Sequence, residues 1–250
     1  MNEKKLVIIP TYNEVENISD ILEKILELQG KFEVLVIDDH SPDGTAEIVK
    51  CWQTKHPERI HLIERMGKMG LGTAYITGFK YAISHDYEYI FEMDADFSHN
   101  PEDLVKLFKA CGEQSFDMAV GSRYITGVNV VNWPMGRVLM SFFASKYVQF
   151  ITGMPIKDTT AGFKCYHKKV LEAIDLDNIK FIGYAFQIEM KFTAWKLGFN
   201  IIEVPIIFTD RTRGTSKMSK HIFREAVLGV IYMKLKSVFK PIRPNRTVSL

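Results

Sequence analysis

The chain has 250 residues, 46% of them hydrophobic and 25% charged, and a formal net charge of +2. This is a globular composition with enough length to bury a core, and the small net charge argues against a dedicated nucleic-acid binder. Three cysteines without a C-x-x-C pair argue against a disulfide framework and suggest a reducing compartment.

The first half of the chain alternates strand and helix. Short apolar, β-branched runs predict strands at residues 5–10, 34–38, 59–64, 89–94 and 117–123. Apolar residues at helical spacing, with Asp43 and Pro101 as start signals, predict helices at residues 15–28, 45–52, 73–84 and 102–111. This alternation predicts an α/β fold with a mostly parallel sheet and helices on both faces.

The second half is less regular. We predict helices at residues 134–151, 183–197 and 219–239, the last of them amphipathic, and a strand at residues 200–208. The expected organisation is one domain over residues 1–240, made of halves 1–125 and 126–240, with a loose tail at 241–250. No run reaches the roughly 18 apolar residues of a membrane span, and the N-terminal run is too short for a signal peptide.

Polar segments follow the predicted strands: "TYNE", "DDHSPDGT", "DADFSH" and "GSRY". In open sheets of this kind, ligands bind beyond the carboxyl ends of the strands. The first strand-to-helix turn has no G-x-G-x-x-G, and no P-loop or G-x-S-x-G elbow occurs, so a dehydrogenase, a P-loop NTPase and an α/β-hydrolase are disfavoured.

Asp94 and Asp96 are the sharpest feature at these ends. In an extended segment, residues i and i+2 point to the same side, so two like charges would face one site. A hard divalent cation would relieve their repulsion, and Mg²⁺ is often held by one or two carboxylates plus substrate phosphates. Ser98 and His99 lie close enough in sequence to assist. A turn in which Asp96 bonds its own backbone is the alternative.

The second acidic pair, Asp38 and Asp39, could accept hydrogen bonds from a ribose or a base, or could belong to a turn rich in Asp, Ser, Pro and Gly. Tyr12 could flank a base or cover the sheet edge. Cations come later, at Arg123, at Arg137 and in the segment "DRTRGTSKMSK". That segment is either a phosphate cradle or a solvated loop. Carboxylates for a metal and cations for phosphates together suggest a reaction between two phosphorylated partners.

The motifs "PTYNE", "VIDDHSPDGT", "GLGTAYITGF", "MDADFSHNPED", "VGSRY", "NWP", "DTTAGFKCY", "GYAFQIEM" and "DRTRGTSK" occur in this order. In this respect the chain resembles the family 2 glycosyltransferases, which have the Rossmann-like GT-A fold, and among them the dolichyl- or polyprenyl-phosphate mannosyltransferases. The resemblance covers nearly all of residues 5–225 and is closest to members without transmembrane helices. It implies an inverting transfer of mannose from GDP-mannose to a polyprenyl or dolichyl monophosphate.

The resemblance also implies roles for individual residues. Pro10, Tyr12, Glu14, Ile37 and Asp39 match positions that hold the nucleoside, with Asp38 beside them. Asp94, Ala95 and Asp96 match the donor and metal motif, in which Asp96 is the main ligand of Mg²⁺ or Mn²⁺. Some relatives have Gln where Ser98 stands, so a metal contact by Ser98 stays open. Arg123 and Arg137 match positions near the acceptor phosphate, and Arg211 and Lys217 match the loop that closes over the donor diphosphate.

A lipid acceptor implies a cytoplasmic enzyme that is peripheral on the membrane face, with a membrane-anchoring subunit as a conceivable partner. The helices at 134–151 and 219–239 have apolar faces and cations suited to an anionic surface, although core packing would explain those faces equally well. Two alternatives stay open: a UDP-glucose-dependent polyprenyl-phosphate glucosyltransferase, and an inactive nucleotide-sugar-binding subunit.

Overall fold

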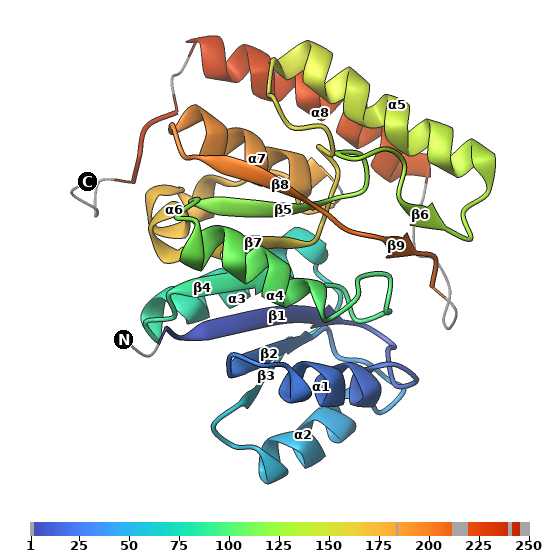
Figure 1. The fold of residues 1–250 in the computed structure, drawn as a ribbon, viewed down its shortest axis with the longest axis vertical. Coiled ribbons are helices and arrows are strands. Elements are labelled where there is room, and N and C mark those ends of the chain that lie inside the picture. Colours follow the sequence, from blue (N-terminus) through green and yellow to red (C-terminus); the bar gives the residue numbers. More distant parts are fainter. Residues whose placement is uncertain (1–2, 184, 212–219, 240–241, 246–250) are drawn as a thin grey trace.

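The computed structural model describes residues 3–183, 185–211, 220–239 and 242–245. A seven-stranded sheet with the order β3-β2-β1-β4-β7-β5-β8 forms its centre (Figure 1). These strands are β1 (Lys5–Thr11), β2 (Phe32–Asp38), β3 (Ile60–Glu64), β4 (Tyr89–Glu92), β5 (Met118–Ser122), β7 (Lys164–His167) and β8 (Ile201–Pro205). Neighbours are parallel except β7, which is antiparallel to both β4 and β5. The predicted mostly parallel α/β fold is confirmed.

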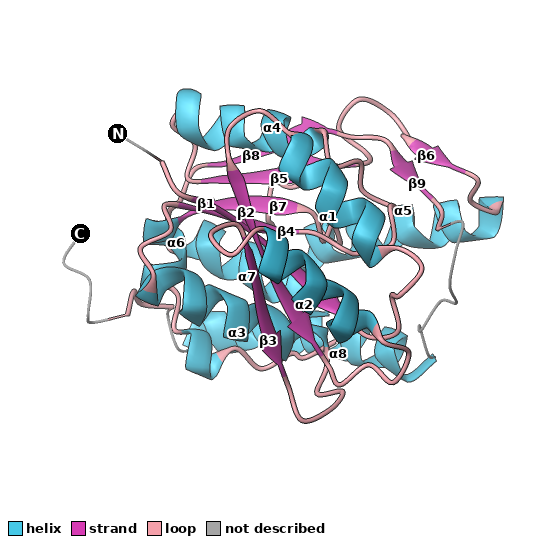
Figure 2. Ribbon diagram, turned by 90° about the horizontal axis from the view of Figure 1, so that it is seen from below, coloured by secondary structure: helices cyan, strands magenta, loops and turns pink. Residues whose placement is uncertain are grey.

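Helices cover both faces of the sheet (Figure 2). One face carries α1 (Ile18–Glu27), α2 (Thr45–Lys55) and α4 (Asp103–Phe108), which continues as the π-helical turn η1 (Lys109–Glu113). The other face carries α3 (Leu71–Ser84), α6 (Lys168–Ala173) and α7 (Ala185–Lys196), with the short 3₁₀ turn η2 (Leu176–Asn178). Helices α5 (Met135–Thr152) and α8 (Lys220–Phe239) pack on α7 at the β8 end of the sheet.

The strand sequence explains the two layers. Successive side chains of a strand point to opposite faces, so a strand buried on both sides reads as a continuous apolar run. In β1, Val7 and Ile9 pack with α1, whereas Leu6 and Ile8 pack with α3. A third cluster joins Val148 of α5, Phe192 of α7 and Val230 of α8.

The sequence did not predict β7, α6, η2 or β6 (Val130–Val131), which forms a two-stranded ribbon with β9 (Phe208–Thr209). Strand β7 reads "KCYH", and a lysine in so short a segment argues against burial on both faces. The structure nevertheless buries Lys164 completely. The single strand predicted at 200–208 is divided, because β8 ends at Pro205 and β9 pairs with β6 instead.

Candidate active site

A cavity of about 880 Å³ opens at the carboxyl ends of β1, β4 and β5. Its size is within the usual range for small-molecule sites. It brings together most of the residues that the sequence singled out. Those lining it are Pro10, Tyr12, Glu14, Asp39, Asp94, Ala95, Asp96, Ser98, Arg123, Arg137 and Arg211. Lys217 lies outside the described residues.

Two of the proposed nucleoside residues do not line the cavity. The side chain of Ile37 is fully buried in the core under α3. Asp38 is buried too, where its carboxylate accepts hydrogen bonds from Thr11 Oγ1 at 2.8 Å and from the backbone N–H of Ser41 at 2.8 Å. Asp38 therefore ties the end of β1 to the turn after β2, and Asp39 is the member of the pair that reaches the cavity.

Asp39 is held by an arginine that sequence reasoning missed. Arg65 Nε donates to Asp39 Oδ1 at 2.6 Å, and Arg65 Nη1 donates to Thr73 Oγ1 at 2.7 Å. Arg65 directly follows β3, so the strand-end rule that found the other segments would have found it as well. The bond leaves Asp39 with a fixed orientation at the cavity wall.

Asp94 lies on the cavity floor just past β4. About 40% of its side chain is accessible, yet protein atoms surround it. Burial, and then the charge of Asp96, raise its pKa to about 7, while Arg211 acts in the opposite direction. Its neighbour His99 is a neutral imidazole, because burial lowers the pKa of His99 to about 4. His99 stacks on Phe163 and accepts from the Asp94 N–H at 3.5 Å.

Asp96 faces two ways. Its Oδ1 accepts from the backbone N–H of Ser98 at 3.0 Å and also from the Ser98 hydroxyl. Its Oδ2 pairs with Arg211 Nη2 at 2.9 Å. The turn offered as the alternative to a metal site therefore forms, with Phe97 in the left-handed region at φ 57°. Oδ1 of Asp96 therefore accepts the hydrogen bonds of the turn, and Oδ2 contacts the guanidinium of Arg211. In this arrangement Ser98 orients Asp96.

The donor chemistry of this pair fits a hard divalent cation. Both side chains offer carboxylate oxygens, and the charge of Asp96 already draws in a guanidinium. Among the residues that the structure describes, no group of three His, Cys, Asp or Glu side chains could hold a metal alone. Mg²⁺ sites often take further oxygen ligands from substrate phosphates.

Metal affinity should depend on pH because of Asp94. With a pKa of about 7, this carboxyl holds a proton below pH 7, and the proton competes with the cation. We expect the affinity for Mn²⁺ to rise about tenfold per pH unit up to pH 7 and to level off above it. Electron paramagnetic resonance titration with Mn²⁺ alone at pH 5.5–8 measures this. Asp94→Asn should abolish the slope, and a flat profile in the unchanged protein would contradict the assignment.

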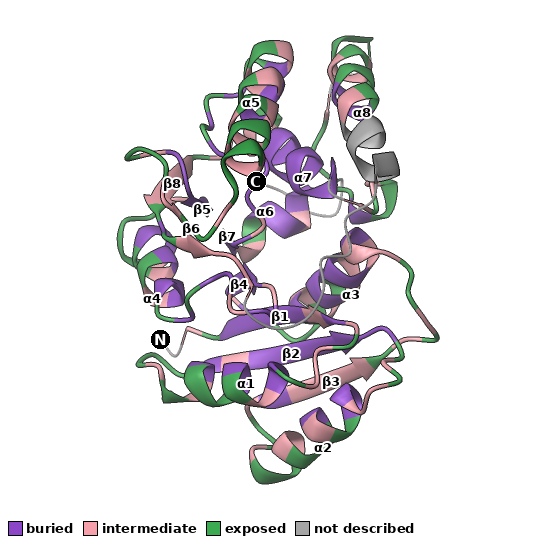
Figure 3. Cartoon of the chain, turned by 90° about the vertical axis from the view of Figure 1, so that its right-hand side faces the viewer, coloured by how far each residue is buried: buried purple, intermediate pink, exposed green. Residues whose placement is uncertain are grey.

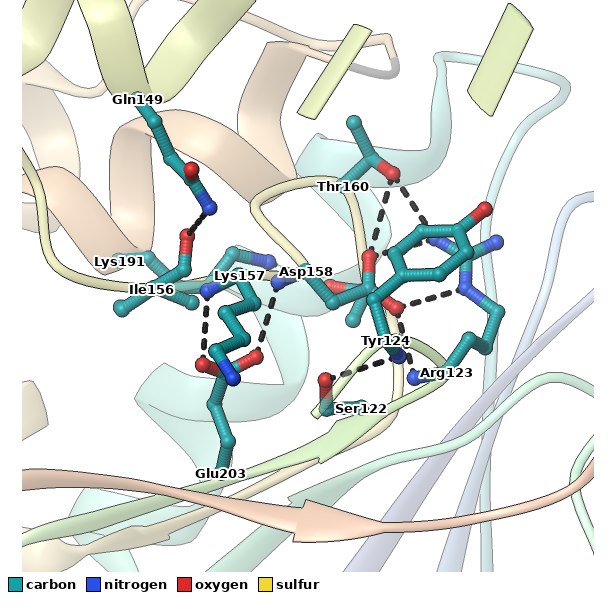
Figure 4. A network of polar contacts seen from close by, with 11 residues as sticks. Ser122, Arg123, Tyr124, Gln149, Ile156, Lys157, Asp158, Thr160, Lys191 and Glu203 are labelled. Atoms are coloured by element: carbon teal, nitrogen blue, oxygen red, sulfur yellow. Dashed lines mark hydrogen bonds and ion pairs between the residues drawn. The ribbon is translucent and has the colours of Figure 1, made fainter. Parts of the chain in front are cut away.

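Arg123 is clamped just past β5 (Figure 4). Its Nε and Nη2 donate to the two oxygens of buried Asp158 at 2.7 and 2.6 Å, and Nη2 also donates to Thr160 Oγ1 at 2.9 Å. Burial alone would raise the pKa of Asp158, but the charge and hydrogen bonds of Arg123 hold it below its usual range. Glu203 in turn accepts from the N–H groups of Lys157 and Asp158 at 2.7 and 2.8 Å.

Arg137 comes from the first turn of α5. Its Nη1 pairs with Asp210 at 2.7 Å, and its guanidinium lies 4.2 Å from the ring centroid of Trp133. Arg123 lies 5.5 Å from the same ring. Trp133 thus stands between the two arginines that sequence analysis assigned to a phosphate. The partners Asp158 and Asp210 were not predicted, because each lies far from its arginine in sequence.

Apolar side chains of α5, and Val227 of α8, also line the cavity. Its walls there include Met140, Phe143, Ala144, Tyr147 and Val227. Tyr147 Oη donates to the carbonyl of Val227 at 2.9 Å, which joins the two helices. The site therefore has a charged end at the sheet and an apolar end at the helix pair.

The fold is that of the GT-A glycosyltransferases. Glucosyl-3-phosphoglycerate synthase from Mycobacterium tuberculosis, solved with Mn²⁺ and UDP, shares the fold with a TM-score of 0.69 and 15% identity; the match covers 99% of this chain and 83% of that one. Mannosyltransferase PcManGT from Pyrobaculum calidifontis, solved with GDP-Man and Mn²⁺, shares it with a TM-score of 0.59 and 20% identity; the match covers 97% of this chain and 66% of that one. Residues 6–175 match "Glycosyl transferase family 2", and the chain belongs to this family.

Two relatives are much closer in sequence. The chain is 43% identical over 228 residues to polyprenol monophosphomannose synthase of Mycolicibacterium smegmatis. This alignment covers 91% of this chain and 86% of that protein. The chain is also 41% identical over 238 residues to undecaprenyl-phosphate mannosyltransferase of Micrococcus luteus. This second alignment covers 95% of this chain and 97% of that protein.

Proposed function

We propose that this chain transfers mannose from GDP-mannose to a polyprenyl monophosphate and so forms polyprenyl-phosphate-mannose. The observation that carries the proposal is the lining of one cavity, which brings together the carboxylate pair, two arginines and apolar side chains of α5 and α8. The names of both close relatives include mannose and a polyprenyl phosphate or its product. An inactive binding subunit would have no use for charged groups at both phosphate positions.

The proposed reaction is a single displacement with inversion. An oxygen of the acceptor phosphate attacks the anomeric carbon and forms a new C–O bond. The bond to the donor diphosphate breaks, and GDP leaves with the electron pair. A phosphomonoester has a second pKa of about 6, so at neutral pH the acceptor needs no catalytic base. This agrees with Glu189, the carboxylate of the "GYAFQIEM" motif, which already accepts from the N–H groups of Lys180 and Phe181 at 2.9 and 3.0 Å.

The residues of the chain then align charges. Asp94 and Asp96 would hold a Mg²⁺ or Mn²⁺ ion, which when bound stabilises the negative charge of the departing diphosphate. Arg211, which pairs with Asp96, would contact that diphosphate as well. Arg123 and Arg137 would aim the acceptor phosphate, and Asp39, Tyr12 and Glu14 would hold the nucleoside. The work of the site is positioning and electrostatic stabilisation.

A comparison of acceptors tests the chemistry. With GDP-mannose as donor, we expect mannosyl transfer to undecaprenyl phosphate and none to undecaprenol of the same length. The phosphate supplies an ionised nucleophile, whereas the alcohol would need a base. Thin-layer chromatography of labelled lipid separates the two products. Equal transfer to the alcohol would contradict the proposal.

We also propose that α5 and α8 rest on the membrane that holds the acceptor (Figure 3). No helix in the described part of the chain is long and apolar enough to cross a bilayer. Large apolar side chains are nevertheless exposed on both helices: Met135, Leu139, Phe143 and Phe150 on α5, and Leu228, Leu235, Val238 and Phe239 on α8. Lys146 and Lys236 are on the same two helices and suit an anionic surface.

Removing two exposed rings should weaken membrane binding. Phe150 and Phe239 are 87% and 84% exposed. Burial of one Phe side chain is worth about 1.5–3 kcal/mol, so the loss of two rings is worth about 3–6 kcal/mol. Phe150→Ser/Phe239→Ser should therefore lower partitioning into anionic liposomes by about 10²- to 10⁴-fold. Co-sedimentation at low salt measures it. Met66→Ser, at a 97% exposed position on the loop after β3, is the control. Unchanged sedimentation of the double variant would argue against this surface.

A further inference from the structure

A fully buried polar network lies behind the carboxylate pair. Glu92, the last residue of β4, pairs directly with Lys164 of β7 in the antiparallel ladder. Lys164 Nζ is 3.0 Å from Glu92 Oε2, and Tyr166 Oη donates to Glu92 Oε1 at 2.7 Å. All three side chains are completely buried. The reaction described above uses none of them.

Gln187 of α7 connects this network to the cavity. Its Nε2 donates to Glu92 Oε2 at 2.8 Å, and its Oε1 accepts from Lys164 Nζ. Both ends of the amide are therefore held by charged groups, which fixes its orientation. Gln187 is the one of these four side chains that lines the cavity.

Gln187 lies between the two groups of charges. Its partner Glu92 is two residues before Asp94, on the side of the carboxylate pair. Gln187 also lies beside Gly162, because a Cβ added at Gly162 would be 3.6 Å from Gln187 Nε2. Gly162 is two residues past Thr160, which contacts Arg123. If the carboxylates take the donor diphosphate and Arg123 the acceptor phosphate, the transferred sugar passes over this floor.

Stability alone does not account for the network. The desolvation of two buried charges commonly cancels their attraction, and an apolar pair of similar volume is often as stable. A second lysine supports the same floor: Lys191 is completely buried, and its Nζ donates to the carbonyl of Ala161 at 2.6 Å. The chain thus places two buried lysines under the part of the cavity between its charged groups.

We propose that Glu92 and Lys164 are positioning residues, which hold the Gln187 amide in the one orientation that contacts the transferred sugar. The proposal rests on the proposed function, because it needs a sugar between two phosphates. Glu92 and Lys164 act through Gln187 and do not themselves touch substrate. Their removal should therefore lower kcat while donor binding is kept.

A mutant cycle tests this. Lys164→Met alone should destabilise the fold, because it leaves Glu92 buried without its cation. Glu92→Gln/Lys164→Met removes both charges and should recover the melting temperature. We expect kcat of this double variant to stay about 10²-fold below the unchanged protein, as for a misplaced contact group. The KM for GDP-mannose and the affinity for GDP with Mn²⁺, measured by calorimetry, should stay within about twofold.

Gln187→Met closes the cycle, since it keeps volume and removes the amide. Gln187→Met alone should lower kcat as much as Glu92→Gln/Lys164→Met does. When the three substitutions are combined, kcat should fall little further. Lys50→Met, in the exposed ion pair with Glu64, should change neither stability nor kcat. A charge-free variant with normal kcat would overturn the proposal. So would a Gln187→Met protein with normal kcat, even if the double variant did not fold.

These outcomes are separable from failure of the proposed function. If the unchanged protein transfers glucose and not mannose, the mannosyl assignment fails, and the same cycle is measured with the glucosyl donor. The positioning role is then decided by the non-additivity of Gln187→Met and the charge-free pair. Full additivity with either donor would overturn it.

Discussion

The Asp96→Asn protein is expected to transfer mannose at least about 10³-fold more slowly than the unchanged enzyme. Asparagine keeps the size of the side chain and an oxygen for the turn at Ser98. It removes the charge that pairs with Arg211 and that would hold the cation. A loss of 10³-fold corresponds to about 4 kcal/mol of transition-state stabilisation, which is within the range for charge stabilisation of this kind.

The measurement is kcat at saturating Mn²⁺ and both substrates, with the melting temperature as a check on folding. Asp86→Asn, in the exposed ion pair with Lys168, is the matched control and should leave kcat unchanged. Full activity of Asp96→Asn at saturating Mn²⁺ would contradict the proposed role of Asp96 in metal binding.

Arg123→Lys should have the second largest effect, a loss of about 10²-fold in kcat/KM for the acceptor. Arg123 binds Asp158 through two nitrogens and Thr160 through one of them. Lysine is a point charge and lacks the planar fork, so it keeps the sign of the charge but loses this geometry. Because Asp158 is buried, the melting temperature should fall as well.

Acceptor titrations at saturating donor measure this prediction. Donor affinity should stay unchanged, since the defect concerns the acceptor phosphate. Arg137→Lys should lose less activity, because Arg137 is partly exposed and pairs with the carboxylate of Asp210 through one nitrogen. If Arg123→Lys used low acceptor concentrations as well as the unchanged enzyme does, the acceptor role of Arg123 would be wrong.

Local sequence pattern predicted the strands and helices of the first half of the chain well. The apolar runs of β1, β2, β4 and β5 are long enough to be recognised, and their polar carboxyl ends predicted one common edge. The structure brings Asp39, Asp94 and Arg123 to one cavity at that edge. Their proximity follows from the parallel direction of the strands, which the alternation of strand and helix already implies.

Contacts between segments far apart in the chain could not be predicted from the sequence. Strand β7 enters the sheet antiparallel between β4 and β5, and a buried lysine conceals it. The pairs Arg123–Asp158 and Arg137–Asp210 join segments 35 and 73 residues apart, so no local spacing announces them. The side chain of Ile37, a residue matched to a nucleoside position, packs into the core, so a contact with a nucleoside there would have to come from its backbone.

One measurement tests the central claim most directly. The protein is incubated with undecaprenyl phosphate and either labelled GDP-mannose or labelled UDP-glucose, with Mn²⁺ or with an excess of chelator. We predict labelled lipid with GDP-mannose and Mn²⁺, and its loss on chelation. Labelled lipid with UDP-glucose alone would contradict the mannosyl assignment, and undiminished transfer in chelator would contradict the role of the carboxylate pair.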